Sequence, residues 1–410
     1  MAAGTVLTGC VLAWALQGDQ TGRIGPYLRL YAAAFTAYLV ALAAAPRLPR
    51  AWLWGALALS FVWRGLLVPA PPLLSDDVYR SVWEGRIQAH GGNPYLWDDR
   101  PEAERWRPQR DAAWARINHK EYPAIYPPLW QLAARAVVAL CDSPGAMKAF
   151  LVLCEALTLV ALARLLARRR LPPERLLVLA WSPLALVEVA GSGHNEPLAI
   201  LFLVLALLAL EAGRTATSLA LAALGAQAKL LPALVALAWA RRYRLRDLPV
   251  AVAAVALPVL PFAAAGAWLW HSLGKYSRFW RFNETGFAVI AMVLRSHEAA
   301  VAAALVLLAG LAAVLAARRT EPATAALAVV AATLLLTPNL LPWYALWLPP
   351  LLVLHESMAL LLFTGTVQLA YLVYPVWQSG ELWRIGWGIR ALEYGPCFAL
   401  ALVEAMRRRQ

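Results

Sequence analysis

The chain has 410 residues, of which 61% are hydrophobic and only 15% are charged, and its mean hydropathy is +0.58. Soluble domains carry about 25% charged residues, so this chain lacks the polar residues that would cover a water-exposed surface. Its apolar residues come in blocks of about 17–20, the length of a helix that crosses a hydrocarbon core of about 30 Å. These properties exclude an ordinary soluble protein and predict an all-α, polytopic membrane protein.

The formal net charge of +13 does not indicate a nucleic-acid partner, because most basic residues lie in short segments between apolar blocks. In membrane proteins, lysine and arginine concentrate in the loops that stay in the cytoplasm. The pattern therefore predicts that the arginine-rich loops and the C-terminus are cytoplasmic. The arginine clusters lie at 47–50, 168–170, 241–246, 318–319 and 407–409.

Apolar segments long enough to cross a membrane recur along the whole chain. The clearest ones are 3–17, 27–45, 51–69, 146–166, 174–190, 196–212, 248–264, 299–317, 322–338, 358–375 and 389–405. Together with two less regular blocks they predict about 12–14 membrane-spanning helices. We divide the chain into N-terminal transmembrane helices at 1–70, an external loop at 71–125, and a transmembrane core with C-terminal helices at 126–410.

The two less regular blocks do not fit simple spans. Block 126–141 is short, begins near two prolines and contains Arg135, so we expect a re-entrant or interfacial helix. Block 215–240 has cytoplasmic signals at both ends, which predicts two short helices that meet near Lys229 inside the membrane. Broken helices at that depth occur only where the backbone is buried in protein or lines a wet cavity. Lys229 therefore marks a candidate site.

The segment 71–125 differs from the rest of the chain in composition. It carries nine of the 24 acidic and eight of the 37 basic residues. A structureless loop of this length is uncommon in a compact protein unless it is functional. Because its tryptophans and tyrosines suit a membrane interface, we expect short amphipathic helices that lie on the membrane surface.

The strongest local signal is the acidic pair Asp76-Asp77, at the beginning of an expected helix that places Arg80 and Glu84 on one face. A carboxylate held near the membrane surface can take a proton from an incoming hydroxyl and act as a general base. The alternative is structural, with Ser75 and Asp76 capping a surface helix. The two roles are compatible.

Two further polar motifs lie at predicted external turns. Asn118 and Tyr126 can bind sugar hydroxyls, whereas a single histidine such as His119 is more often a structural hydrogen-bond partner. The motif at 191–196 interrupts two apolar spans and contains side chains that can hydrogen-bond, although an ordinary hairpin loop is the alternative. The buried Glu188 just before it favours a site, because carboxylates inside a membrane are costly.

Basic side chains also occur where membrane topology does not explain them. Lys229 lies in the middle of an apolar block, and the segment 275–284 is basic although it is predicted to be external. Both can bind an anionic phosphate. The alternatives are that Lys229 reaches a lipid headgroup and that 275–284 forms an amphipathic interfacial helix. The proline-containing turn 337–344 either packs aromatic rings or lines a sugar site.

Short motifs follow one order along the chain and cover about residues 70–355. They are Asp76-Asp77-x-Tyr79, Gly91-Gly92-Asn93-Pro94-Tyr95, Tyr126-Pro127-Pro128, Ser182-Pro183, Gly193-His194-Asn195-Glu196, Lys229-x-x-Pro232, Phe282-Asn283 and Trp343-Tyr344-x-x-Trp347. This order resembles membrane glycosyltransferases of the GT-C superfamily. More closely, it resembles bacterial polyprenyl-phosphate-mannose-dependent transferases and the catalytic subunit of GPI mannosyltransferase I.

The resemblance implies a GT-C fold with a large first external loop whose acidic residue, here Asp76 or Asp77, is catalytic. It implies that basic residues hold the donor phosphate, and the candidates are Lys229, Arg80, Arg86, Arg278 and Arg281. The candidate sugar- and acceptor-binding residues are Tyr79, Glu84, Asn93, Asn118, His119, Tyr126, His194, Asn195, Glu196, Asn283, Trp343 and Tyr344. Members of the family often have aspartate at the position of Glu196.

We therefore predict a glycosyltransferase that moves a hexose, by resemblance mannose, from a polyprenyl-phosphate donor to a lipid or glycan acceptor with inversion. The expected location is the bacterial inner membrane, with the active site on the external, periplasmic face and membrane lipids as neighbours. No metal ligand is assigned, although a divalent cation (Mg²⁺ or Mn²⁺) near the two aspartates is compatible with this chemistry. The alternative is a transporter or flippase of lipid-linked or small polar substrates, which would also use broken helices and buried charge.

Overall fold

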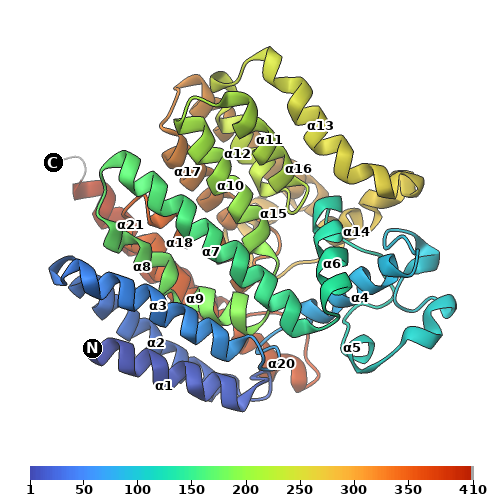
Figure 1. The fold of residues 1–410 in the computed structure, drawn as a ribbon, viewed down its shortest axis with the longest axis horizontal. Coiled ribbons are helices and arrows are strands. Elements are labelled where there is room, and N and C mark those ends of the chain that lie inside the picture. The colour runs from blue at the N-terminus through green and yellow to red at the C-terminus, as the bar shows by residue number, and fades with distance from the viewer. Residues whose placement is uncertain (408–410) are drawn as a thin grey trace.

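The computed structural model describes residues 1–407, so Arg408 and Arg409 of the last arginine cluster lie outside the described residues (Figure 1). Over the described range the chain forms helices and no strands, apart from one isolated bridge between Phe282 and Asn339. Five helices within this range are long and apolar enough to cross a membrane. They are Ile24–Arg47, Pro144–Arg169, Leu245–Phe279, His297–Ala317 and Met358–Gln378. The prediction of an all-α polytopic membrane protein is confirmed.

The N-terminal region forms three helices, with α1 packed against both α2 and α3. They are α1 (Ala2–Gln17), α2 (Ile24–Ala44) and α3 (Arg50–Leu67), and the short 3₁₀ turn η1 (Ala45–Arg47) follows α2. Tyrosines of α2 anchor this unit to the rest of the protein. The Tyr38 hydroxyl donates to the Val178 carbonyl at 2.7 Å, and the Tyr31 hydroxyl donates to the Thr364 carbonyl at 2.9 Å.

The segment 71–125 folds into short helices, as its composition predicts. These are α4 (Asp77–Ala89), η2 (Trp97–Asp99), η3 (Glu104–Gln109) and α5 (Ala112–Ala115). Helix α4 packs closely on α6 (Pro128–Leu140) at Gly85, which has no side chain. A Cβ at this position would lie only 2.6 Å from the Ala134 carbonyl oxygen. At 13 residues, α6 is about 20 Å long and shorter than a hydrocarbon core, which agrees with a helix that does not span.

The expected span 174–190 is not one continuous helix. It consists of η4 (Pro173–Leu176), α8 (Leu177–Ala180), α9 (Pro183–Ala185) and the π-helical turn η5 (Leu186–Gly191). Pro183 cannot continue α8, and it begins a new helix that is capped by the Ser182 hydroxyl. Turns of the π type often occur at functional sites. Here residues 192–195 connect the π-helical turn to α10 (Glu196–Glu211).

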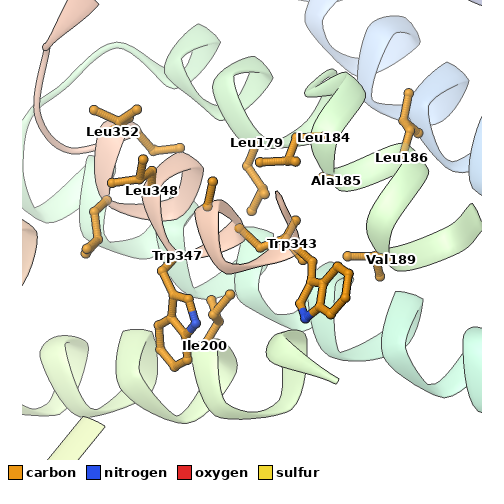
Figure 2. Close-up of a cluster of buried hydrophobic side chains, with 14 of the residues drawn as sticks. Leu179, Leu184, Ala185, Leu186, Val189, Ile200, Trp343, Trp347, Leu348 and Leu352 are labelled. Carbon is orange, nitrogen blue, oxygen red and sulfur yellow. The ribbon is translucent and has the colours of Figure 1, made fainter. Parts of the chain in front are cut away.

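The central core lies between α7 (Pro144–Arg169), α10 and the segments around α9. Figure 2 shows the indoles of Trp343 and Trp347 in this core with side chains from α8, α9, η5 and α10. The two tryptophans belong to η9 (Pro342–Trp347), which continues into α18 (Leu348–Leu352). Because this core is apolar and filled, it fixes the position of the polar turn at 191–196 beside it.

The broken helix expected at 215–240 is confirmed. Four residues, 227–230, separate helix α11 (Thr215–Ala226) from α12 (Leu231–Ala238), and Lys229 lies in this break. The break leaves the Gln227 carbonyl free to accept from the backbone N–H groups of Leu129 and Trp130, at 2.9 and 3.3 Å. The break in one helix therefore satisfies unpaired donors at the beginning of α6.

The remaining elements complete the bundle. They are η6 (Ala240–Arg242), η7 (Leu245–Asp247), α13 (Leu248–Val259), η8 (Leu260–Trp270), α14 (His271–Phe279), α15 (Gly286–Leu294), α16 (His297–Ala317), α17 (Pro322–Leu336), α19 (Met358–Thr366), η10 (Val367–Leu372), α20 (Val373–Gln378) and α21 (Trp387–Arg407). Figure 1 shows α4, α5, α6 and α14 at one end of the molecule, away from the N-terminus and the end of α21.

Candidate active site

Segments that are far apart in the sequence meet beside the filled core. They are the beginning of α4, the loop at 118–126, the turn between η5 and α10, the break between α11 and α12, and η9 with the preceding turn. Most of the polar and aromatic residues that the sequence motifs single out lie on these segments. We call this region the α4–α10 site.

The two aspartates of the acidic pair have different surroundings. Asp77, the first residue of α4, accepts a hydrogen bond from Asn118 Nδ2 at 3.1 Å, and its other oxygen lies 3.7 Å from His194 Nδ1. Asp76 is more exposed (45% against 26%) and pairs with Arg116, which also contacts Asp19. Asp77 therefore faces the other site residues, whereas Asp76 belongs to an outer ion cluster.

The helix-capping alternative applies to Ser75 and not to the Asp76 carboxylate. Asp76 occupies the N-cap position of α4 without making a side-chain cap bond, whereas the Ser75 hydroxyl accepts from the Asp77 N–H at 3.2 Å. Burial raises the pKa of the Asp76 carboxyl, and the nearby Arg116 guanidinium opposes that rise only in part. Its position therefore reflects ion pairing and not capping.

Lys229 is held by one carboxylate oxygen, one side-chain amide oxygen and two aromatic rings. Its ammonium group forms an ion pair with Glu196 and a 3.2 Å hydrogen bond with Asn195 Oδ1. The Nζ atom also lies 5.3 Å from the centroid of the Tyr126 ring and 5.1 Å from that of Tyr344. Aromatic faces stabilise a cation that has lost part of its water. Lys229 is therefore an oriented positive charge, and its side chain remains 17% exposed.

Aromatic side chains extend this arrangement toward α14. The Tyr344 hydroxyl lies 2.6 Å from the Tyr276 hydroxyl, which also accepts from Asn339. The Tyr276 ring stacks on Trp280, with centroids 5.7 Å apart. Trp280 in turn meets the His119 ring at 5.1 Å. The segment 275–284 thus contributes an aromatic wall that the basic pattern of the sequence did not indicate.

Close backbone packing holds the turn at 191–196 in place. Gly193 has a φ of 83°, and a Cβ there would lie 2.9 Å from Val78 Cγ2 on α4. A Cβ at Gly191 would lie 2.6 Å from Leu73 Cδ1. Only glycine permits both the left-handed backbone and this approach. The two glycines therefore let the turn pack against Val78 of α4 and against Leu73, which precedes this helix.

Buried polar atoms without a hydrogen-bond partner gather in this turn and the neighbouring break. Among the described residues they include Ser192 Oγ, Asn195 Nδ2, Glu196 Oε2 and Gln227 Oε1; His194 Nε2 is also unpaired, but it lies 3.4 Å from Glu188 Oε2. More than about 90% of buried polar groups in proteins are paired. Unpaired donors and acceptors that lie together indicate a place where a polar ligand completes the hydrogen bonds, and a sugar has suitable hydroxyls.

Three residues proposed as ligands on α4 have structural partners instead. Arg80 donates to the carbonyls of Asn118 and His119, at 2.5 and 2.6 Å, and so holds the loop that carries Asn118. Glu84 accepts from Gln131 of α6 at 2.7 Å. Arg86 lies between Asp111 and Asp142, about 13 Å along α4 from Asp77. These contacts support the site without lining it.

The other candidate residues also lie apart from Asp77 and Lys229. Asn93 closes a turn by accepting from the Tyr95 N–H, and Asn283 donates to Glu393 of α21 at 2.8 Å. Arg281 pairs with Glu284. Arg278 lines an open groove of about 390 Å³, with Lys275, Trp268, Trp270 and His271 among its other lining residues. The Tyr79 ring lies 5.3 Å from the guanidinium of Arg116, in the outer ion cluster.

The structure adds residues that lie in the segments named above but were not among the candidate site residues. Gln227 and Ser192 contribute unpaired buried atoms, and Tyr276 and Asn339 extend the aromatic wall. Gln227 had a signal, since it is a polar residue two positions before Lys229 in an apolar block. Tyr276 had no such signal, because the basic residues beside it, Lys275 and Arg278, indicate phosphate binding or an interfacial helix and not an aromatic wall. Across residues 1–407, no group of three or more histidine, cysteine, aspartate or glutamate side chains could hold a metal ion.

A comparison with known proteins assigns the chain to a family. Residues 4–243, more than half of the chain, match the family described as alpha-(1->6)-mannopyranosyltransferase, N-terminal domain. The match includes Asp77, His194 and Lys229 and ends before the aromatic residues of α14 and η9. No curated protein and no solved structure gave a match. The chain belongs to the alpha-(1->6)-mannopyranosyltransferase family and is a mannosyltransferase of the GT-C type.

Proposed function

We propose that this mannosyltransferase takes mannose from a polyprenyl-phosphate donor and transfers it, with inversion, to a lipid or glycan acceptor. The observation that carries the proposal is the group of unpaired buried polar atoms at 192–196 and Gln227. This group has a carboxylate, Asp77, near one side and an ammonium group, Lys229, near the other. A base and a phosphate-binding cation are the two charges that such a transfer requires.

Asp77, and not Asp76, is our candidate for the general base. It faces His194 and is held by Asn118, so the direction of its carboxylate is defined. Asp76 is engaged with Arg116. In the proposed step, Asp77 takes the proton of the acceptor hydroxyl, and that oxygen forms a bond to the anomeric carbon of mannose. The bond from that carbon to the phosphate oxygen breaks, and its electron pair leaves on the lipid phosphate.

Lys229 is our candidate for the group that stabilises the departing phosphate. Its charge is already oriented by Glu196, Asn195 and two tyrosine rings, so little reorganisation is needed when negative charge develops nearby. A phosphate in contact with Lys229 would share the ammonium group with Glu196. Arg278 and Lys275, on the open groove at α14, are candidates for a second contact with the donor headgroup.

We place the reaction on the external, periplasmic side of a bacterial inner membrane. The support is the position of α4 and α14 at the end of the molecule away from the end of α21 (Figure 1), because the arginine-rich C-terminal sequence is a cytoplasmic signal. A donor that carries its own lipid and phosphate suits a site without a nucleotide-binding motif. Membrane lipids surround the spans, and the isoprenoid tail lies among them.

The test compares Asp77→Asn with Asp76→Asn in purified enzyme in detergent. Transfer of mannose from polyprenyl-phosphate mannose to a short synthetic α-mannoside is measured, with and without Mg²⁺ or Mn²⁺. Asp77→Asn should lower kcat by about 10²–10⁴-fold, the contribution of a general base. Asp76→Asn keeps the site-facing carboxylate and should reduce kcat less than about tenfold. Full activity of both variants would exclude the acidic pair as the source of the base.

A further inference from the structure

One imidazole ring lies between two carboxylates in the α4–α10 site. His194 Nδ1 is 3.7 Å from Asp77 Oδ2, and His194 Nε2 is 3.4 Å from Glu188 Oε2. His194 is 2% exposed and Glu188 is fully buried. Neither contact is a hydrogen bond in this structure, and Nε2 has no hydrogen-bond partner. Contacts of this kind at catalytic sites often tighten only when substrate binds. The ring thus connects the candidate base on α4 with a carboxylate of the π-helical turn η5.

The orientation of this ring is fixed from two directions. Its plane stacks on the Trp343 indole, with centroids 3.8 Å apart and an interplanar angle of 14°. The His194 backbone N–H donates to the Glu188 carbonyl at 3.0 Å, so the histidine and the glutamate belong to one turn of backbone. Trp343 itself belongs to the filled core beside the turn (Figure 2). The ring is therefore held with Nδ1 near Asp77 and Nε2 near Glu188.

Glu188 has neutral partners apart from His194. Its carboxylate accepts from Gln368 Nε2 at 2.8 Å and from the Tyr371 hydroxyl at 3.0 and 3.1 Å. Within residues 1–407, no lysine or arginine nitrogen lies within 4.0 Å of it. A buried carboxylate without a cation is costly. The one group in contact with Glu188 that can become positive is the imidazole of His194.

The other charged groups around the ring already have partners. Lys148 of α7, whose stem lies beside Gly193, donates to the carbonyls of Leu67 and Ala70, at 2.8 Å each. Lys229, at the break between α11 and α12, is paired with Glu196. Neither cation contacts Glu188 or Asp77. The balance of charge at His194 is therefore set by the two carboxylates that flank it.

We propose that His194 and Glu188 form a proton relay behind Asp77. In this relay Glu188 positions His194 and stabilises its protonated form. This inference rests on the proposed function. Before reaction, His194 is neutral, with its proton on Nε2 toward Glu188 and the lone pair of Nδ1 toward Asp77. When Asp77 removes the acceptor proton, that proton passes to Nδ1. The resulting imidazolium is stabilised by Glu188, and Asp77 remains an anion beside the forming bond.

The relay makes a specific prediction for Glu188→Gln, which keeps the shape of the side chain and removes its charge. The imidazolium loses its stabilisation, so kcat should fall about 10- to 100-fold while KM for the donor and the acceptor stays within about twofold. Because protonated His194 also becomes less stable before reaction, the acid limb of the profile of kcat/KM against pH should move to lower pH. Glu188→Asp, which keeps the charge, should recover part of kcat and the position of the limb.

A matched control is Glu155→Gln, which removes another buried carboxylate of the same bundle, one that pairs with Arg64. It should lower thermal stability and leave the pH profile of the folded enzyme unchanged. Tyr371→Phe removes one donor to Glu188 without removing charge, and it should leave the acid limb in place.

The outcomes separate the relay from the proposed function. If Glu188→Gln shows the wild-type kcat and pH profile while Asp77→Asn is inactive, the relay is wrong and the base assignment stands. If Asp77→Asn and Asp76→Asn are both active, neither aspartate is the general base and the proposed function is wrong on this point. Where Glu188→Gln does not fold, Glu188→Asp carries the test. The relay then fails if kcat of Glu188→Asp equals that of the wild type.

Discussion

Two ion pairs in the interior of this protein have similar chemistry, but the hydrogen bonds of one pair are all formed and those of the other are not. In the bundle, Arg64 of α3 binds Glu155 of α7 through two parallel hydrogen bonds of 2.6 and 2.7 Å. Its third nitrogen donates to the carbonyls of Ser60 and Ala180. In the α4–α10 site, Lys229 binds Glu196, whose second oxygen has no partner.

These two pairs show how a charge that stabilises the fold differs from a charge that is available for function in an apolar chain. Arg64 is fully buried and Glu155 almost so, and both carboxylate oxygens are used. Such a pair binds helices together and has no hydrogen bonds left to offer. The pair at Lys229 remains partly exposed and lies among other unpaired polar atoms. Incomplete hydrogen bonding, and not burial of charge as such, therefore marks the site.

The largest expected effect concerns the complete pair. Arg64→Ala leaves Glu155 as an uncompensated buried charge and should lower the free energy of unfolding by about 3–5 kcal/mol. Denaturant unfolding in detergent measures this loss. The double variant Arg64→Met with Glu155→Met should regain most of it, because no charge remains unpaired. If the single variant were as stable as the wild type, the pair would not bind the helices.

The second prediction concerns the incomplete pair. Lys229→Met removes a charged hydrogen-bond donor, worth about 1.5–3 kcal/mol, and should raise KM for polyprenyl-phosphate mannose by about 10- to 100-fold. The double variant Lys229→Met with Glu196→Gln should restore stability without restoring donor binding. Unchanged donor affinity in the folded single variant would remove Lys229 from the phosphate site.

A smaller effect is expected from the rings around Lys229. Tyr344→Leu removes the aromatic face 5.1 Å from Nζ, and this contact is worth about 0.5–2 kcal/mol. Tyr344→Phe keeps the face and loses only the hydroxyl contact with Tyr276. We expect the leucine variant to bind the donor less tightly than the phenylalanine variant. Equal donor affinity of the two variants would show that the ring face does not orient the lysine.

The smallest effect extends the comparison to an exposed pair. Trp114 and Arg86 lower the pKa of Asp111 below its ordinary value of 3.8, more than burial raises it. A carboxyl with a lowered pKa in the folded state contributes stability above its ordinary pKa, and this stability is lost as pH falls through the folded value. Since Asp111 is 46% exposed, the contribution should be below about 1 kcal/mol. Asp111→Asn should flatten acid unfolding, measured by circular dichroism, below about pH 4.

Much of the architecture could be predicted from composition and spacing. The apolar blocks predicted an all-α membrane protein, and the cytoplasmic signals at both ends of 215–240 predicted the break between α11 and α12. The segment 71–125 forms short helices because it is too polar and aromatic to span. The expected span 174–190 was the exception, since hydropathy does not reveal how Pro183 and a π-helical turn interrupt a helix.

The residue types available for chemistry could be read from the sequence alone: an acidic pair, a turn rich in glycine and polar residues, and a lysine within an apolar block. Their partners became visible only in the folded protein. The tertiary structure turned Asp77 toward His194 and Asp76 toward Arg116, although the two are adjacent, because successive side chains of a helix point in different directions. It also gave Arg80 and Arg86 structural partners. The hydrogen-bond and ion-pair partners of these residues lie on elements far away in the chain, so the local sequence does not predict them.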